Sequence, residues 1–197
     1  MPQAAASSSC CRCSSWTTRG DARSTTRSAC GPGCNTRSNE QLQVEMGYEF
    51  KARRFSTALQ NLQGDMHSVS MFANYALRAD VALYGQLIWR DSDARMAVFA
   101  YRERIARLGV MVALGTDATM NLSYGYRGRS ADAANAVFGK QQRDHENSIY
   151  VQLGLPGYAW AGLTPSVSYE YRNNSSTIAH AYNYEKSRLT LGMTKVF

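Results

Sequence analysis

Cysteine and histidine are the side chains in this sequence whose types and spacing are best suited to chemistry. All five cysteines fall in the first 34 residues, at positions 10, 11, 13, 30 and 34. Cys11-x-Cys13 and Cys30-x3-Cys34 supply four thiolates, which is the donor set of a structural zinc site. Zinc pairs are usually more tightly spaced and lie in a more structured setting. We therefore predict no metal site here.

The three histidines, His67, His145 and His180, are scattered along the chain. A Ser–His or Cys–His hydrolase needs its partners brought together in space. Ser68 follows His67, but neighbours on a strand point to opposite faces. After residue 40 there is no glycine-rich phosphate loop, no paired-carboxylate motif and no metal-ligand spacing. We therefore expect no enzyme, no catalytic residue and no cofactor.

The elements that would position any site begin at residue 41, with the segment QLQVEMGYEFK. Apolar residues such as Leu42 and Val44 alternate there with polar ones such as Gln43 and Glu45. Alternation of this kind predicts a strand between an apolar and a polar environment. The pattern recurs along the chain, and we predict eight strands, at 41–51, 68–78, 80–90, 101–114, 120–127, 148–155, 163–172 and 189–197.

The predicted connections alternate between long and short. A tight turn at Ala79–Asp80 contrasts with the long segment GRSADAANAVFGKQQRD, which reads as a polar outer loop, either a solvated cap or a client contact. Outer-membrane barrels have short periplasmic turns and longer outer loops, whereas soluble sandwiches show no such rhythm. Strands of roughly 9 to 12 residues also suit a tilted crossing of the hydrocarbon layer.

The predicted fold class is therefore all-β: an antiparallel up-and-down transmembrane β-barrel. About eight strands are present, as a complete barrel or as part of a larger one. In lipid every backbone polar group needs an internal partner, so such strands must close. Residues 1–40 are rich in small polar residues and arginine, without apolar periodicity, and predict a disordered low-complexity leader. The barrel domain is predicted over residues 41–197.

Two sets of site residues follow from the alternation. The polar face would line the lumen, where its side chains either contact a passing client or, the favoured reading, pair with one another to fill a narrow barrel. The lumen-facing candidates are Glu45, Glu49, Asn74, Arg78, Gln86, Arg107, Arg127, Glu170, Arg172 and Arg188. Aromatic residues near strand ends would anchor the barrel in outer-membrane lipid at the interface. These anchors are Trp89, Tyr126, Tyr169, Tyr171 and Phe197.

The C-terminal residues and the net charge of the chain indicate which partners to expect. A terminal aromatic such as Phe197 resembles the C-terminal signature that barrel-insertion machinery recognises. Lys195 departs from that signature by lying on the apolar face, where its long stem would snorkel. The net charge of +7 is spread without a basic run, so no nucleic-acid partner is expected.

The last 36 residues resemble the C-terminal barrel of the surface lipoprotein assembly modifier family. The resemblance lies in Gly162-Leu163-x-Pro165, Ser168-Tyr169-Glu170-Tyr171-Arg172-x-Asn174, Tyr182-x-Tyr184, Arg188 and Phe197. The segments YGQLIWR and RERIARLGVMVALG look like earlier strands of the same barrel, which extends the resemblance to about residues 41–197.

The resemblance implies an outer-membrane protein of Gram-negative bacteria that helps a client lipoprotein reach the cell surface. It also implies an N-terminal periplasmic domain of helical repeats and a barrel of more than eight strands, so this chain is expected to be a C-terminal portion. The expected function is non-enzymatic assistance of lipoprotein display. The alternative is a small outer-membrane barrel with a porin-like or structural role, and the third is an outer-membrane hydrolase.

Overall fold

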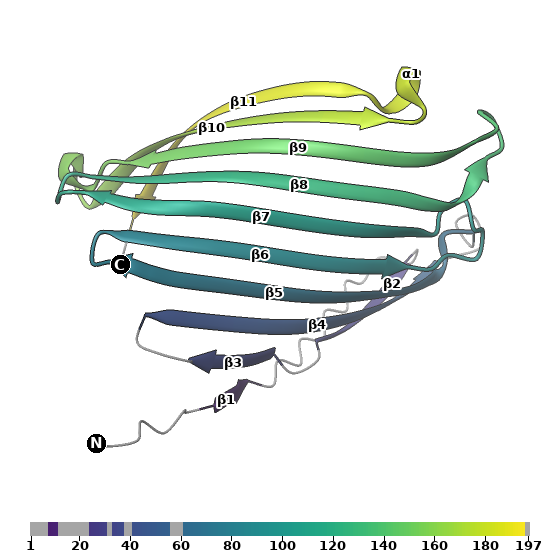
Figure 1. Ribbon diagram of the computed structural model, residues 1–197, viewed down its shortest axis with the longest axis horizontal. Coiled ribbons are helices and arrows are strands. Elements are labelled where there is room, and N and C mark those ends of the chain that lie inside the picture. The colour runs from purple at the N-terminus through teal and green to yellow at the C-terminus, as the bar shows by residue number, and fades with distance from the viewer. Residues whose placement is uncertain (1–7, 12–23, 31–32, 38–40, 56–60, 196–197) are drawn as a thin grey trace.

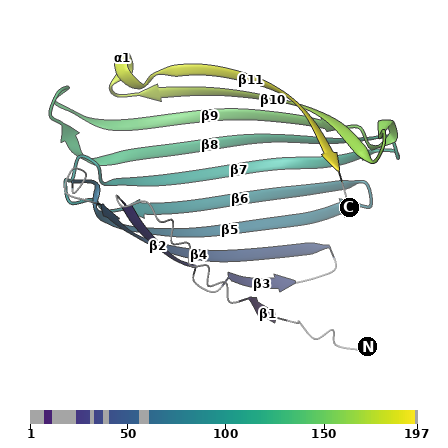
Figure 2. The ribbon, with the colours of Figure 1, turned by 180° about the vertical axis from the view of Figure 1, so that it is seen from behind.

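Strands account for nearly all of the described part of the chain. The computed structural model describes residues 8–11, 24–30, 33–37, 41–55 and 61–195. They form one curved antiparallel sheet, with β11 at one edge and the strands of the first 40 residues at the other (Figures 1 and 2). No helix in these ranges is long and apolar enough to cross a membrane.

Eight consecutive strands make up the body of the sheet, each pairing with the next. They are β4 (Leu42–Phe55), β5 (Gly64–Arg78), β6 (Val81–Ser92), β7 (Tyr101–Leu114), β8 (Ala118–Asn135), β9 (Lys140–Gly154), β10 (Leu163–Ser176) and β11 (Tyr184–Lys195). All eight predicted strands and their up-and-down order are confirmed. Among the described residues β11 pairs only with β10, so the sheet is not closed.

Three short strands lie in the first 40 residues, where composition predicts a disordered leader. They are β1 (Ser8–Cys11), β2 (Ser24–Cys30) and β3 (Gly33–Arg37). β2 and β3 both pair with β4, and β1 pairs with β3. Backbone pairing along a free strand edge needs no apolar periodicity, which is why the sequence pattern does not reveal it. The domain boundary at residue 40 stays a prediction.

The hairpin of β8 and β9 is the main departure from the predicted connections. The segment predicted as a long polar loop is mostly strand, and the turn between β8 and β9 is limited to residues 136–139. A register irregularity between Ser130 and Ala134 interrupts the pairing. The loop prediction is wrong because this part of the hairpin is polar on both faces, so its strands carry no apolar alternation. The hairpin tip projects at the right of Figure 1.

The two ends of the sheet differ. At one end are the turns at residues 79–80 and 115–117 and the link at 155–162, which contains the helical turn η2 (Pro156–Tyr158). At the other end are the link at 93–100, the tip of the β8–β9 hairpin and the link at 177–183, which contains α1 (Ala179–Tyr182). We call these the short-turn end and the long-link end. They lie at the left and the right of Figure 1, respectively.

Burial in this sheet is inverted relative to a soluble protein. Large apolar side chains are exposed: Leu108 keeps 70% of its surface and Leu191 keeps 78%. Polar side chains on the opposite face are covered: Glu103 is 1% exposed and Ser92 is 0% exposed. A contiguous exposed apolar surface is rare on soluble monomers, but it is what a barrel wall presents to hydrocarbon.

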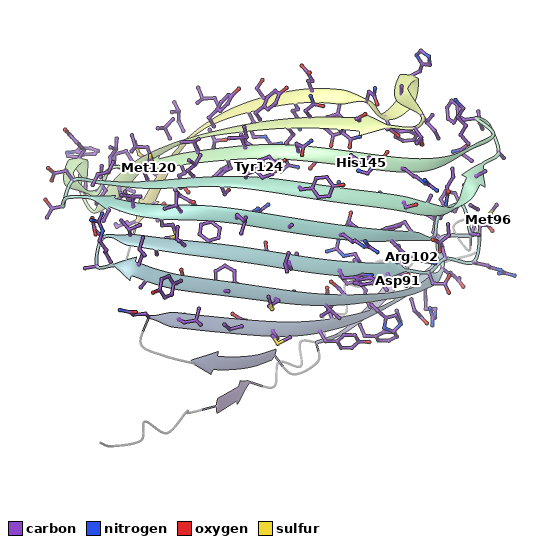
Figure 3. The ribbon with its side chains drawn as sticks, in the orientation of Figure 1. Asp91, Met96, Arg102, Met120, Tyr124 and His145 are labelled. Carbon is purple, nitrogen blue, oxygen red and sulfur yellow. The ribbon has the colours of Figure 1, made fainter. Side chains whose placement is uncertain are left out.

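One row of register partners crosses all eight strands of the outward face and is apolar throughout. Starting at Leu189, the register partners across the sheet are Tyr169, Val151, Leu122, Val110, Leu83, Tyr75 and finally Leu42. This row is apolar on all eight strands. Figure 3 shows the same face along β8 and β9, with Met120, Tyr124 and His145 following one another toward the long-link end.

The edge of the apolar band slants across the strands. On β4 the band extends to Phe50 toward the long-link end, whereas on β11 it stops at Leu189, whose register row meets β4 at Leu42. The edge therefore drifts by about one residue per strand. With about 3.3 Å per residue and about 4.8 Å between strands, this drift corresponds to a tilt of roughly 40°. Transmembrane barrel strands are tilted by about 35–45°, so a flat hydrocarbon layer accounts for the slant.

Candidate functional site

A chain of charged side chains crosses the polar face near the long-link end. Its centre is Glu103 on β7, whose carboxylate accepts a hydrogen bond from Arg90 on β6. The other carboxylate oxygen, Oε1, accepts from Nε of Arg127 on β8 at 2.6 Å. Two guanidinium groups therefore compensate one carboxylate that is almost completely buried, as a buried charge requires.

The chain continues from Arg127 toward β9, β10 and β11. Nη1 of Arg127 lies 3.8 Å from Oε2 of Glu146, and the Tyr184 hydroxyl donates a hydrogen bond to the same carboxylate. Asn174 on β10 donates from Nδ2 to the carbonyl of Tyr182 at 2.7 Å. Side chains of β6, β7, β8, β9 and β11 are thus tied together on one face. We call Arg90, Glu103, Arg127, Glu146 and Tyr184 the ion-pair chain.

Strand register explains why these groups meet. Arg90 is the register partner of Glu103, and Arg127 is the register partner of Glu146. Arg127 reaches Glu103 diagonally, since its own partner on β7 is Ile105. Direct and diagonal neighbours on one face of a sheet are the pairs within reach of long side chains. Beside this chain lies a cavity of about 250 Å³ lined in part by Asp144, Glu146 and Tyr182.

The predicted lumen residues lie on the polar face with one exception. Register joins Glu45, Phe72, Gln86 and Arg107 across four strands. Glu49 forms an ion pair with Lys51, with 3.1 Å between Oε1 and Nζ. Asn74 is the register partner of Tyr84. The exception is Arg78, which a register irregularity places opposite Val81, and which forms an ion pair at 3.5 Å with Asp80 of its own turn.

Only part of the predicted set is brought together. Arg127 joins the ion-pair chain, and Arg172 pairs with Glu170 at 2.6 Å. Arg188 is the register partner of Glu170, but no ion pair or hydrogen bond joins its side chain to another described residue. The same is true of Arg107. The polar face therefore combines a paired charge network with basic groups that have no partner in the described ranges.

Three of the predicted interface anchors mark the edge of the apolar band. Trp89, Tyr126 and Tyr171 are each the last apolar residue of the outward face on their strands, toward the long-link end. Tyr169 lies one step inside the band, in the row of Leu189. Phe197 lies outside the described residues. The three edge positions follow the slanted boundary, which is where an aromatic girdle lies.

Sequence reasoning missed most of the ion-pair chain. Arg90, Glu103, Glu146 and Tyr184 were not among its candidates. The alternation already contained a signal for two of them, since Glu103 has the same parity along its strand as Arg107, and Arg90 the same as Gln86. The long range of the network, which joins β8 to β11 through Glu146, is set by register and sheet curvature and leaves no local pattern.

Two of the three histidines lie away from the ion-pair chain. Nδ1 of His67 is hydrogen-bonded to the Tyr48 hydroxyl at 2.6 Å, and Nδ1 of His145 to the Tyr126 hydroxyl at 2.7 Å. Register places both histidines on the outward face. No group of three metal-ligating side chains occurs among the residues whose placement is described. The cysteine side chains lie outside what the structure describes.

Comparison with known proteins agrees with the sheet geometry. A model of the family named surface lipoprotein assembly modifier matches residues 20–197. A surface lipoprotein assembly modifier of Haemophilus influenzae (strain 86-028NP) is 23% identical over 155 residues, covering 79% of this chain and 31% of that protein. The hemophilin secretion modulator of Acinetobacter baumannii is 26% identical over 98 residues, covering 50% of this chain and 20% of that protein. The chain thus spans a third or less of the length of these relatives.

Solved structures share the fold at low identity. Outer-membrane expressed OmpT of Vibrio cholerae matches with a TM-score of 0.59 and 11% identity, over 76% of this chain and 46% of that one. The in-vitro folded form of the same protein matches with a TM-score of 0.58 and 9% identity, over 85% and 54%. The sheet is therefore of the outer-membrane barrel type.

The barrel-type sheet, its exposed apolar band and the family match together place the protein in the outer membrane of a Gram-negative bacterium. Since the family model covers nearly the whole sequence, the chain belongs to the surface lipoprotein assembly modifier family.

Proposed function

We propose that this sheet forms part of a barrel wall that guides a client lipoprotein to the cell surface, without catalysis. The apolar band holds the wall in the membrane, and the polar face supplies the contacts to the client. The observation that carries the proposal is the combination, on one face, of a rigid paired network with basic side chains that have no partner among the described residues.

The basic side chains are close together by register. Arg107 connects through Gly125 and Ser148 to Arg172 and then to Lys186. Arg188 follows in the adjacent row. Among these cations, only Arg172 has an ion-pair partner within the described ranges, which is Glu170. Glycine and serine between the cations leave room on this face for an extended client segment, and the surplus of positive charge favours an acidic one.

A non-catalytic role is supported by the placement of two of the three histidines. Register separates His67 and His145 from the polar face, and a tyrosine hydroxyl already engages one ring nitrogen of each. A general base has to lie within hydrogen-bond reach of the group that it activates. An assisting role needs only surfaces that bind weakly and release.

Surface display of a lipoprotein tests the proposal. An epitope-tagged surface lipoprotein from the same bacterium would be produced in a Gram-negative host with and without the protein. Antibody binding to intact cells measures the displayed fraction, and lysed cells give the total. Display should require the protein and should fall several-fold in the triple variant Arg107→Gln, Lys186→Gln, Arg188→Gln.

A control variant removes one positive charge at a position away from the polar face. Arg78→Gln removes an arginine at the short-turn end and should leave display unchanged. Equal display with and without the protein would refute the assisting role. Equal display by the triple variant and the unaltered protein, at equal barrel levels, would refute the assignment of the client contact to these cations.

A further inference from the structure

Four basic side chains gather on the outward face at the long-link end, and the ion-pair chain does not use them. Register joins Arg104 through Gly128 to His145, and Arg102 through Ser130 to Arg143. We call Arg102, Arg104, Arg143 and His145 the rim cluster. All four are exposed. Figure 3 shows Arg102 and His145 toward that end of the sheet.

The rim cluster lies just beyond the edge of the apolar band. Ala106 and Tyr126 are register partners and are the last apolar residues of β7 and β8 on this face. Arg104 is the next outward-facing residue on β7, about 7 Å farther along the strand. Its guanidinium lies over the Trp89 ring, 5.0 Å from the ring centre. This is the height of lipid headgroups, directly above a surface that contacts acyl chains.

A cavity lies over β8, between the basic side chains of β7 and those of β9. Gly128 and Ser130 on β8 carry no side chain and a small one, respectively, whereas β7 and β9 on either side carry the four basic groups. The result is a cavity of about 560 Å³ lined by the rim cluster, Gly128 and Ser130. Arg129 also lines it, but its guanidinium lies over the Tyr101 ring at 3.9 Å, and its register partner on β7 is Glu103 of the polar face.

The positive charge of the rim cluster is poorly compensated. Asp132 lies 3.8 Å from Nε of Arg102, and among the described residues that line the cavity it is the one carboxylate. Arg143 donates to the neutral side-chain oxygen of Gln141 at 3.1 Å. Arg104 faces an aromatic ring. Arginine binds phosphate through paired N–H donors, and a group of arginines around a hollow is suited to an anion with several oxygens.

We propose that the rim cluster binds the phosphate groups of a phosphorylated glycolipid in the outer leaflet, the lipid A portion of lipopolysaccharide. The long-link end of an outer-membrane barrel faces outward, so the cluster meets the outer leaflet. The phosphates sit in the hollow over Gly128 and Ser130. The acyl chains descend along the adjacent apolar surface at Leu108, Leu122 and Tyr124, which is continuous with the cluster by register.

Lipid binding to the full chain in detergent micelles tests the site. Native mass spectrometry with added lipid A measures the bound fraction, for the unaltered protein and for the triple variant Arg102→Gln, Arg104→Gln, Arg143→Gln. We expect binding to weaken by about 10- to 30-fold in the triple variant. Lipid A freed of both phosphates should bind the unaltered protein as weakly as intact lipid A binds the variant.

Two controls separate the site from folding and from bulk charge. The triple variant with lysine in place of each arginine keeps the charge but loses the paired N–H donors, so it should bind more weakly than the unaltered protein and more tightly than the glutamine variant. Arg78→Gln matches Arg102→Gln, because both side chains are exposed (69% and 64%) and each has one carboxylate within 4 Å, but they lie at opposite ends of the sheet. Only Arg102→Gln should weaken binding. Unchanged binding in the triple glutamine variant, or equal binding of lipid A with and without phosphates, overturns the proposal.

Discussion

Arg104 and Trp89 are register partners on β7 and β6, and the guanidinium of Arg104 lies over the indole ring at 5.0 Å. Trp89 is the last apolar residue of the outward face on its strand, and Arg104 is the first charged one on its own. A cation over an indole face suits the boundary between hydrocarbon and headgroups, because the ring is apolar and the cation stays hydrated. The pair therefore marks where the membrane core ends.

The coupling between Arg104 and Trp89 can be measured directly. A double-mutant cycle with Trp89→Leu and Arg104→Gln, followed by urea unfolding in lipid vesicles, should give a coupling of about 0.5–1 kcal/mol. The matched cycle of Trp89→Leu with Arg107→Gln should give none, because Arg107 lies on the opposite face. Coupling of equal size in both cycles would show that the contact is not specific.

The destabilisation caused by an arginine introduced on β7 should depend on how deep the position lies in the membrane. Val110 lies in the row that is apolar on all eight strands, and Ala106 lies at the band edge on the same face. Val110→Arg should destabilise the protein in vesicles by about 2–4 kcal/mol, and Ala106→Arg by about 0–1 kcal/mol. The measurement is urea unfolding followed by tryptophan fluorescence. Equal costs at the two positions would contradict a hydrocarbon layer over this face.

Removal of Glu103, the centre of the ion-pair chain, should strongly lower the free energy of unfolding. Glu103→Ala leaves Arg90 and Arg127 without their shared, buried carboxylate and should cost about 3–5 kcal/mol. Glu170→Ala is the control, because it also removes an arginine partner, but from a more exposed pair, and should cost about 1 kcal/mol or less. Both are read from unfolding in vesicles. If the Glu103 variant were as stable as the Glu170 variant, the network would have no structural role.

Close packing on the polar face predicts a difference between two glycines. A Cβ on Gly109 would lie 2.3 Å from Cζ of Tyr84, whose hydroxyl donates to Asn121 Oδ1 at 2.8 Å. Gly109→Ala should therefore displace Tyr84 and cost about 1–3 kcal/mol. A Cβ on Gly85 of the neighbouring strand would meet Leu108 Cδ2 at 3.4 Å, so Gly85→Ala should be tolerated. Equal stability of the two variants would show that Tyr84 moves freely.

Alternation of apolar and polar residues was enough to predict the eight strands, their order and which face is apolar, because side-chain direction has period two on any strand. It predicted Arg127 on the polar face and Trp89 at the membrane edge for the same reason. It failed where a second signal is needed: the upper part of β8 and β9 is polar on both faces, and Arg78 follows a register irregularity. Register also decides that Glu103 meets Arg127 and that Arg104 shares a hollow with Arg143, and the sequence alone does not contain register.

The most direct test of the account is the environment of neighbouring residues on β8. Spin labels at Leu122 and at Asn121 would be introduced one at a time, with the five native cysteines replaced by serine. In lipid vesicles, the label at Leu122 should be accessible to oxygen and shielded from a water-soluble nickel complex. The label at Asn121, on the opposite face, should be less accessible to oxygen. Equal oxygen accessibility at the two positions, or preferential access of the nickel complex to the label at Leu122, would contradict the placement of the apolar face in hydrocarbon.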